Sequence, residues 1–96
     1  MTIKTIDGFT SVVNPIDLLN TLSETLILSQ EEIISDRDFE SKIDEIDQVE
    51  IIMKLEKIYN INIDDDLCYS IWSGGFISRF LISGLRDSKL SELGIQ

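Results

Sequence analysis

Apolar residues recur at the spacing of a helix along most of the chain, whereas the alternation that indicates a strand is weak throughout. Asn14 can cap a helix and Pro15 suits a first helical position, so a helix is expected to begin there. The spacing predicts four helices, at about residues 15–28, 44–59, 67–72 and 76–85. The predicted fold is all-α, a four-helix bundle whose core includes Leu19, Leu22, Leu26, Ile51, Leu55, Ile58, Phe76 and Phe80.

A polar segment separates the first two long helices. Ser29 and Glu32 stand three residues apart, as in a capping box, which predicts a short helical turn at this point. Residues 36–43 are mostly polar and are expected to form the long loop of the domain, with Phe39 and Ile43 as apolar anchors. Loops of this length are usually functional or held by such anchors.

The first residues are predicted to form an N-terminal extension of a single domain that spans residues 1–96. Gly8 is expected to act as a breaker within residues 1–13. The apolar residues of this stretch nevertheless favour packing on the body of the domain. They are Ile3, Ile6, Phe9, Val12 and Val13.

Glycines also divide the C-terminal part of the sequence. Residues 73–75 predict a break before the last long helix, and Gly84 is expected to fray or bend the end of that helix. Residues 86–96 are predicted to be a C-terminal extension. A further short helix is expected within it, with Leu90 and Leu93 facing inward.

The helix predicted at residues 44–59 carries apolar residues on two sides. At about 100° per residue, one stripe forms the expected core face: Ile51, Ile52, Leu55, Ile58 and Tyr59. A second apolar group, flanked by Glu50 and Lys57, lies on the other side: Ile46, Val49 and Met53. One apolar face is enough for a helix on a small bundle. The second group therefore indicates either a binding surface or a helix that is buried on most sides.

The charge of the chain narrows the range of possible partners. Its 18 acidic and 8 basic residues give a net charge of −10. Such a surface repels the phosphate backbone of nucleic acids, so no nucleic-acid partner is expected. It favours rapid association with a basic protein, although acidity alone can also serve solubility.

Composition argues against several other classes of protein. The sequence has no histidine, which is the commonest general base and the commonest metal ligand, and we expect no enzyme. A single cysteine, Cys68, cannot form an internal disulfide, which fits a reducing compartment. No apolar run approaches the roughly 18–20 residues of a membrane span, and the N-terminus lacks a signal-peptide pattern. A cytoplasmic monomer is therefore expected.

Three further features have alternative interpretations. The aspartates at 64–66 offer oxygen ligands for Ca²⁺ or Mg²⁺, but they lack the spacing of an EF-hand loop, so helix capping is favoured and no metal is expected. Trp72 is either a core residue, which is favoured, or an exposed anchor. Cys68 is interpreted as a small core residue, because no histidine is present to activate it.

The segment 44–56 resembles the second helix of acyl carrier proteins. In that family the helix opens with Asp-Ser-Leu-[Asp/Glu] and continues as an acidic helix with Val and Met, where this chain has Asp44-Glu45-Ile46-Asp47. The similarity covers about residues 15–85, and Phe39 matches a phenylalanine that anchors the family's long loop. The resemblance implies an acyl-carrier-like four-helix bundle with a long loop between its first and second helices.

Glu45 stands where the family has the serine that carries 4'-phosphopantetheine. A carboxylate has no hydroxyl to phosphorylate, so this cofactor is not expected and Glu45 is interpreted as a vestigial attachment position. The resemblance also implies that the docking surface of the family is retained. The resemblance implies a partner-binding set of Glu45, Ile46, Asp47, Val49, Glu50, Met53 and Glu56.

Three functions are compatible with these observations. The first is an acyl-carrier-like protein that has lost its prosthetic group and docks on a basic partner, such as a carrier-dependent enzyme. The second is an acidic immunity or antitoxin protein that covers a basic toxin, and here the fold would be incidental. The third is a genuine carrier with a displaced attachment serine, for which Ser41 is the candidate.

Overall fold

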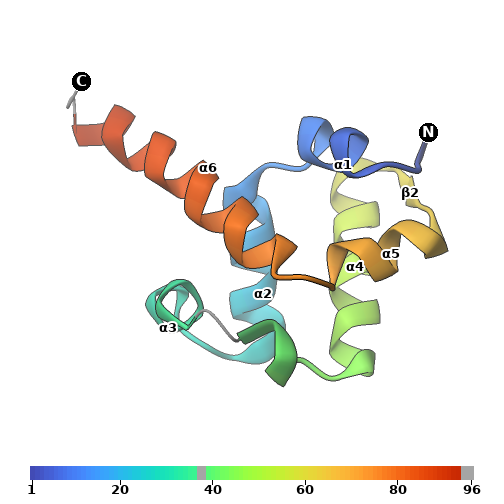
Figure 1. Cartoon of the computed structure of the whole chain (residues 1–96), viewed down its shortest axis with the longest axis horizontal. Coiled ribbons are helices and arrows are strands. Elements are labelled where there is room, and N and C mark those ends of the chain that lie inside the picture. Colours follow the sequence, from blue (N-terminus) through green and yellow to red (C-terminus); the bar gives the residue numbers. More distant parts are fainter. Residues whose placement is uncertain (37–38, 94–96) are drawn as a thin grey trace.

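The computed structural model describes residues 1–36 and 39–93, and for residues 85–93 it describes the backbone alone. Within these residues the fold is all-α apart from one pair of two-residue strands (Figure 1). Six α-helices occur: four correspond to the four predicted helices, one to the predicted short turn after Ser29, and the first was not predicted. They are α1 (Ile6–Val12), α2 (Pro15–Leu26), α3 (Gln30–Ser35), α4 (Glu45–Tyr59), α5 (Asp65–Ile71) and α6 (Phe76–Leu93), with a 3₁₀ helix, η1 (Phe39–Lys42).

The predicted start of α2 is confirmed, and its end lies two residues earlier than predicted. Asn14 caps the helix by accepting a hydrogen bond from the Ile16 N–H at 2.8 Å. Ile27 then adopts a left-handed conformation with φ of 55°, which ends the helix at Leu26. The Ile27 side chain is 89% exposed, so this apolar residue does not belong to the core.

The connection between α2 and α4 contains both α3 and η1. The capping box of α3 is confirmed: the Glu32 N–H donates to the Ser29 hydroxyl, and the Ser29 N–H donates to the Glu32 carboxylate, both at 3.1 Å. Phe39 and Ile43 are buried, so their predicted role as anchors is also confirmed. The long loop is therefore held to the core over most of its described length.

α4 spans the predicted range but presents a narrower core face than expected. Ile51 and Leu55 are fully buried, whereas Ile58 is 55% exposed. The prediction that Ile58 belongs to the core is wrong. Ile58 lies about 60° from Leu55 around the helix, at the edge of the buried stripe and in the last turn of the helix.

The N-terminal residues pack on the body, as predicted, but Gly8 does not break their structure. It lies inside α1, where its N–H donates to the capping Thr5 hydroxyl at 3.0 Å, and Phe9 is fully buried. Before α1, strand β1 (Thr2–Ile3) pairs in parallel with β2 (Asn62–Ile63). This pairing fixes the chain between α4 and α5.

α6 is one continuous helix from Phe76 to Leu93, which contradicts both the predicted end near residue 85 and a separate helix after it. Gly84 lies within the helix, beside Pro15 at the start of α2. A Cβ atom at Gly84 would lie 2.2 Å from the Pro15 Cγ atom, so glycine permits the two helices to approach closely. The side chains of Leu90 and Leu93 lie outside the described residues.

The core lies between α2, α4, α5 and the first half of α6. The aromatic rings of Phe9, Phe76 and Phe80 form one cluster, with centroids 5.6–5.9 Å apart. Of the predicted core, Leu19, Leu22, Ile51 and Leu55 are buried, and Leu26, Phe76 and Phe80 are partly buried against it. Within the described part of the chain, no helix is long and apolar enough to cross a membrane.

Candidate functional site

α4 has an exposed apolar stripe on the side away from the α2 contact. Asp44 caps the helix by accepting from the Asp47 N–H at 2.8 Å, which fixes the start of α4 and the register of its faces. Ile46, Val49 and Met53 are 79%, 58% and 61% exposed. We call these three residues the α4 apolar stripe. Their exposure rules out the alternative that α4 is buried on most sides.

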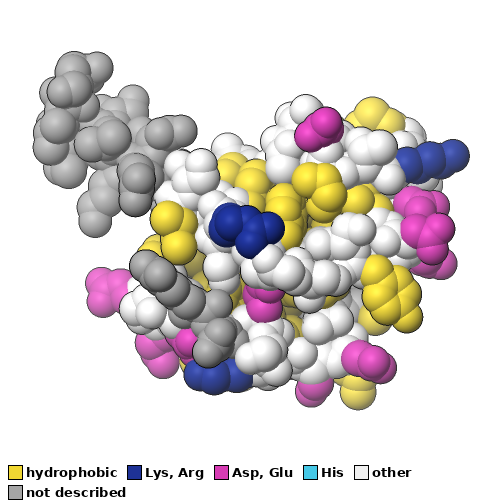
Figure 2. All heavy atoms as spheres, viewed as in Figure 1, with side chains coloured by type: hydrophobic (Ala, Val, Ile, Leu, Met, Phe, Trp, Pro, Cys, Tyr) yellow, Lys and Arg dark blue, Asp and Glu magenta, His cyan; other side chains and the backbone are white. Residues whose placement is uncertain are grey.

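Carboxylates flank the α4 apolar stripe. Glu45 and Glu50 are exposed, and Asp47 and Glu56 are half-buried. Within the described residues, none of these four carboxylates forms an ion pair. Lys57 is exposed in the last turn of α4. Figure 2 shows hydrophobic side chains at the surface beside α4 and α5, with acidic side chains around them.

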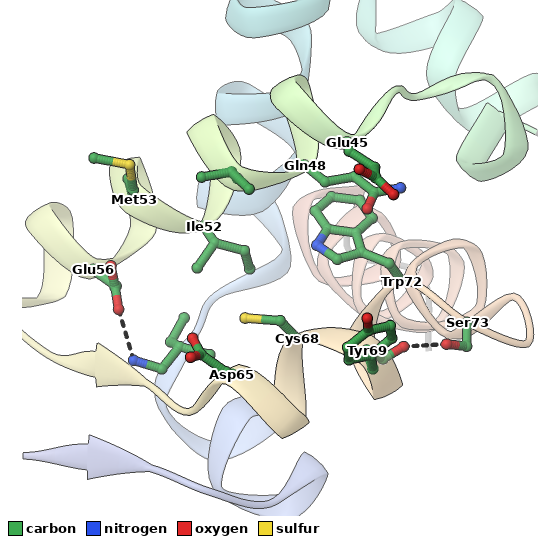
Figure 3. Close-up of a pocket in the computed structure, with 12 residues that line it drawn as sticks. Glu45, Gln48, Ile52, Met53, Glu56, Asp65, Cys68, Tyr69, Trp72 and Ser73 are labelled. Atoms are coloured by element: carbon green, nitrogen blue, oxygen red, sulfur yellow. Dashed lines mark hydrogen bonds between the residues drawn. The ribbon is translucent and has the colours of Figure 1, made fainter.

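The seven residues predicted as a docking surface separate into two groups. Glu45, Val49, Met53 and Glu56 line a groove between α4 and α5 (Figure 3). Ile46, Asp47 and Glu50 do not line this groove. Asp47 instead lines a separate hollow that includes Lys42 of η1.

The groove, here called the α4–α5 groove, has a volume of about 480 Å³. Its second wall comes from α5 and the residue that follows it: Asp65, Cys68, Tyr69 and Trp72. Figure 3 shows the Ile52 side chain and the Cys68 Sγ atom directed into the space between the two helices, with the Trp72 indole beside them. The groove therefore has an apolar base.

The aspartates at the start of α5 act as helix caps, as the sequence predicted. Asp64 is the N-cap, and one of its carboxylate oxygens accepts from the Asp66 N–H at 3.2 Å. Asp65 and Asp66 lie in the first turn, where negative charge is favourable at the positive end of the helix. Within the described residues, no group of three or more histidine, cysteine or acidic side chains is arranged to hold a metal ion.

Cys68 is half-buried in the groove wall, and its environment disfavours the thiolate. Burial raises the pKa of the Cys68 thiol, and the negative charges of Asp65, Glu56 and Asp64 raise it further. A thiol with a raised pKa is a poor nucleophile at neutral pH. This agrees with the interpretation of Cys68 as a packing residue.

Trp72 is partly buried and packs against the core. Its indole N–H is buried and has no hydrogen-bond acceptor among the described residues. Buried polar groups of this kind are uncommon in folded proteins. The favoured interpretation of Trp72 as a core residue holds in part, because its side chain packs against the core and also lines the groove.

Glu45 is the first residue of α4, and its side chain is exposed. The resemblance drawn from the sequence aligns this position with the serine of the acyl-carrier motif. Ser41, the alternative attachment residue, lies within η1 and is exposed, three residues before the α4 cap. The two candidate positions thus lie in different elements, and only Glu45 lies at the start of a long helix.

The sequence did not assign the α5 wall of the groove to the site. Tyr69 is 80% exposed and lies one turn of α5 after Asp65, on the wall that faces α4. Tyr69 stands beside Cys68 and three residues before Trp72, and this pattern was a signal for the wall. The wall was missed because Cys68 and Trp72 were interpreted mainly as core residues, although Trp72 was also considered as an exposed anchor.

Comparisons with known proteins identify no relative of this chain. No family model matches it, and no curated protein or solved structure is significantly similar.

Proposed function

We propose that this chain is a binding protein that docks on a basic protein surface through α4. The observation that carries the proposal is the α4 apolar stripe, whose three side chains are each more than half exposed on an ordered helix. Contiguous exposed apolar residues with a polar rim are typical of protein interaction sites. The flexible thioether of Met53 suits a surface that adapts to a partner.

The charges around the stripe support a basic partner. Glu45 and Glu50 are exposed and form no ion pair within the described residues, so their charge is available to a partner. Such rim carboxylates mainly accelerate association, and burial of the apolar centre mainly slows dissociation. The net charge of −10 also attracts a basic partner, and it does so over a longer range than the rim carboxylates alone.

The docking surface is proposed to be that of an acyl carrier protein without its prosthetic group. Four helices, α2, α4, α5 and α6, are in the order expected of a carrier bundle, and α3 and η1 occupy the connection between its first two helices. Glu45 is exposed at the first position of α4, where a carrier has its serine. With a carboxylate there, the chain would act by binding and would carry no acyl group.

The proposal is tested by comparative affinity capture from the source cell. The bait proteins are the wild type, the variant Val49→Glu/Met53→Glu, and a control, Glu24→Gln/Glu31→Gln, whose exposed positions lie on α2 and α3. A genuine partner is retained by the wild type and the control and lost with the α4 variant. A carrier-dependent enzyme among such proteins supports the carrier-like function, and a basic toxin supports the immunity function instead. If every captured protein is retained equally by all three baits, α4 is not the docking surface.

A further inference from the structure

The α4–α5 groove has an apolar base and an acidic rim. Ile52 and Cys68 contribute to the base, and Glu45, Glu56 and Asp65 are the ionisable residues of the lining apart from the cysteine and tyrosine. No lysine or arginine belongs to this lining within the described residues. An occupant that is both apolar and cationic would complement this groove.

Glu56 and Asp65 place two carboxylates at one end of the groove. Glu56 accepts a hydrogen bond from the Ile63 N–H at 2.8 Å, which fixes its carboxylate beside β2. Asp65 lies in the first turn of α5, and its side chain is exposed at the rim of the groove. Neither forms an ion pair within the described residues. Their charge reaches the Cys68 thiol, whose pKa is raised by burial and then by Asp65 and Glu56.

Aromatic side chains line the other part of the groove. Tyr69 is 80% exposed on α5, and the Trp72 indole lies beside the Cys68 Sγ atom and Ile52 (Figure 3). The long aliphatic stem of an arginine can pack on these rings while its charged group lies farther along the groove. A guanidinium also forms paired hydrogen bonds to carboxylates and is more weakly hydrated than an ammonium group, so it loses less on entering a partly buried site.

We propose that the α4–α5 groove receives an arginine side chain of the basic partner. The aliphatic stem of the arginine would pack on Ile52 and Cys68, and its guanidinium would lie between Glu56 and Asp65. This inference rests on the proposed function, because the arginine belongs to the surface that docks on α4. It adds that the partner is recognised by an inserted residue in addition to the charge of the α4 face.

The proposal is tested with a small probe, Nα-acetyl-arginine methylamide, and its uncharged isostere, Nα-acetyl-citrulline methylamide. Trp72 is the single tryptophan of the chain, so its fluorescence reports directly on the groove. We expect saturable binding of the arginine probe with a dissociation constant on the order of 1 mM, as for a ligand of about 16 non-hydrogen atoms. The citrulline probe should bind about tenfold more weakly, because it lacks the charge-assisted hydrogen bonds.

Variants then locate the bound guanidinium. Glu56→Gln keeps the side-chain oxygen that accepts from Ile63 but removes the charge, and it should weaken arginine binding about tenfold. Glu31→Gln makes the same change at an exposed position on α3 and should leave binding unchanged. Circular dichroism and thermal unfolding of both variants show that the fold is retained. If Glu56→Gln does not fold, Asp65→Asn provides the same test.

Three results would overturn the proposal. They are an absence of saturation in the millimolar range, equal binding of the citrulline probe, and equal effects of Glu56→Gln and Glu31→Gln. The proposed function has its own test, the affinity capture. It is contradicted if the Val49→Glu/Met53→Glu bait retains the partner. Arginine binding that is lost with Glu56→Gln would still support an arginine site in the groove, with a partner that approaches from α5.

Discussion

The Tyr59 hydroxyl, at the end of α4, donates a hydrogen bond to the Asp17 carboxylate in the first turn of α2. The same hydroxyl accepts a hydrogen bond from the Asn14 N–H at 2.9 Å. A single side chain thus joins the last turn of the candidate docking helix to the cap of its main packing partner. The antiparallel arrangement of α2 and α4 depends on this contact as well as on the core.

Tyr59→Phe removes both hydrogen bonds and should therefore destabilise the protein by about 1–3 kcal/mol, since one hydrogen bond usually contributes about 0.5–1.5 kcal/mol. Burial, followed by the hydrogen bond to Asp17, raises the pKa of Tyr59 above its ordinary value of 10.0. The folded state therefore holds this proton more tightly than the unfolded state. The contribution is fully present below pH 10 and is lost as the pH rises through the folded-state pKa. Urea unfolding of both proteins should be measured from about pH 8 to about pH 11, a range that brackets the ordinary tyrosine pKa. The difference in their free energies of unfolding should shrink as the pH rises. A constant difference would contradict this account.

Gly84→Ala should destabilise the protein although alanine is the better helix former. The added Cβ would lie 2.2 Å from the Pro15 Cγ atom and 2.7 Å from its Cβ atom, so α6 and α2 would have to separate. Such overpacking costs about 1–3 kcal/mol, against a gain of about 1 kcal/mol in helix propensity. Ser83→Ala, at the neighbouring exposed position, is the control and should have little effect. Urea unfolding midpoints measure both. A Gly84→Ala protein that is more stable than the wild type by about 1 kcal/mol, the full gain in helix propensity, would mean that the close crossing does not exist in solution.

Leu55→Ala and Ile58→Ala should differ strongly, although the sequence places both residues on one apolar stripe. Leu55 is fully buried, so its truncation should cost about 2–5 kcal/mol. Ile58 is 55% exposed, and its truncation should cost less than about 1 kcal/mol. Chemical denaturation of the two variants decides the matter. Equal losses would show that the core face of α4 is assigned wrongly.

The comparison of these two residues also shows what the sequence could predict. Helical spacing and caps located α2, α4 and α5 to within a few residues, because local signals such as Asn14 and Asp44 determine where those helices begin. The spacing could not show that Ile58 is exposed. The burial of Ile58 depends on which elements cover the last turn of α4, and helical periodicity carries no information about neighbouring elements.

Glycines were the main source of error in the predicted elements. Gly8 and Gly84 were interpreted as breaks, yet both lie inside helices where another group approaches closely. At Gly8 an added Cβ would lie 3.2 Å from the Thr5 hydroxyl oxygen, and at Gly84 it would meet Pro15. A helical glycine can mark a break or a close contact, and only the tertiary structure distinguishes the two.

The candidate site was predicted only in part for a similar reason. The exposed stripe on α4 followed from its helical spacing, and its three residues are exposed as that interpretation requires. The α5 wall comes from a separate segment of the chain, which the parallel pairing of β1 with β2 holds in place. Two-residue strands leave no readable pattern in a sequence, so the placement of this wall beside α4 could not be predicted.

The protein should not be modified by a phosphopantetheinyl transferase, because Glu45 occupies the position of the attachment serine. A carboxylate lacks the hydroxyl that the transfer reaction phosphorylates, so incubation with coenzyme A and a broad-specificity transferase should not change the intact mass. A gain of one phosphopantetheine, mapped to Ser41, would instead identify a carrier with a displaced serine. Glu45→Ser provides a matched variant, since it restores a hydroxyl at the first position of α4.

Association with a partner identified by the three-bait capture tests the central claim most directly. Surface plasmon resonance at several salt concentrations should show that Asp47→Lys/Glu50→Lys slows association strongly at low salt and less at high salt, where screening shortens the range of charge. Met53→Ala should speed dissociation with little change in salt dependence. Docking through α4 would be contradicted if the charge reversals left the association rate unchanged while substitutions at Asp64, Asp65 or Trp72 abolished binding.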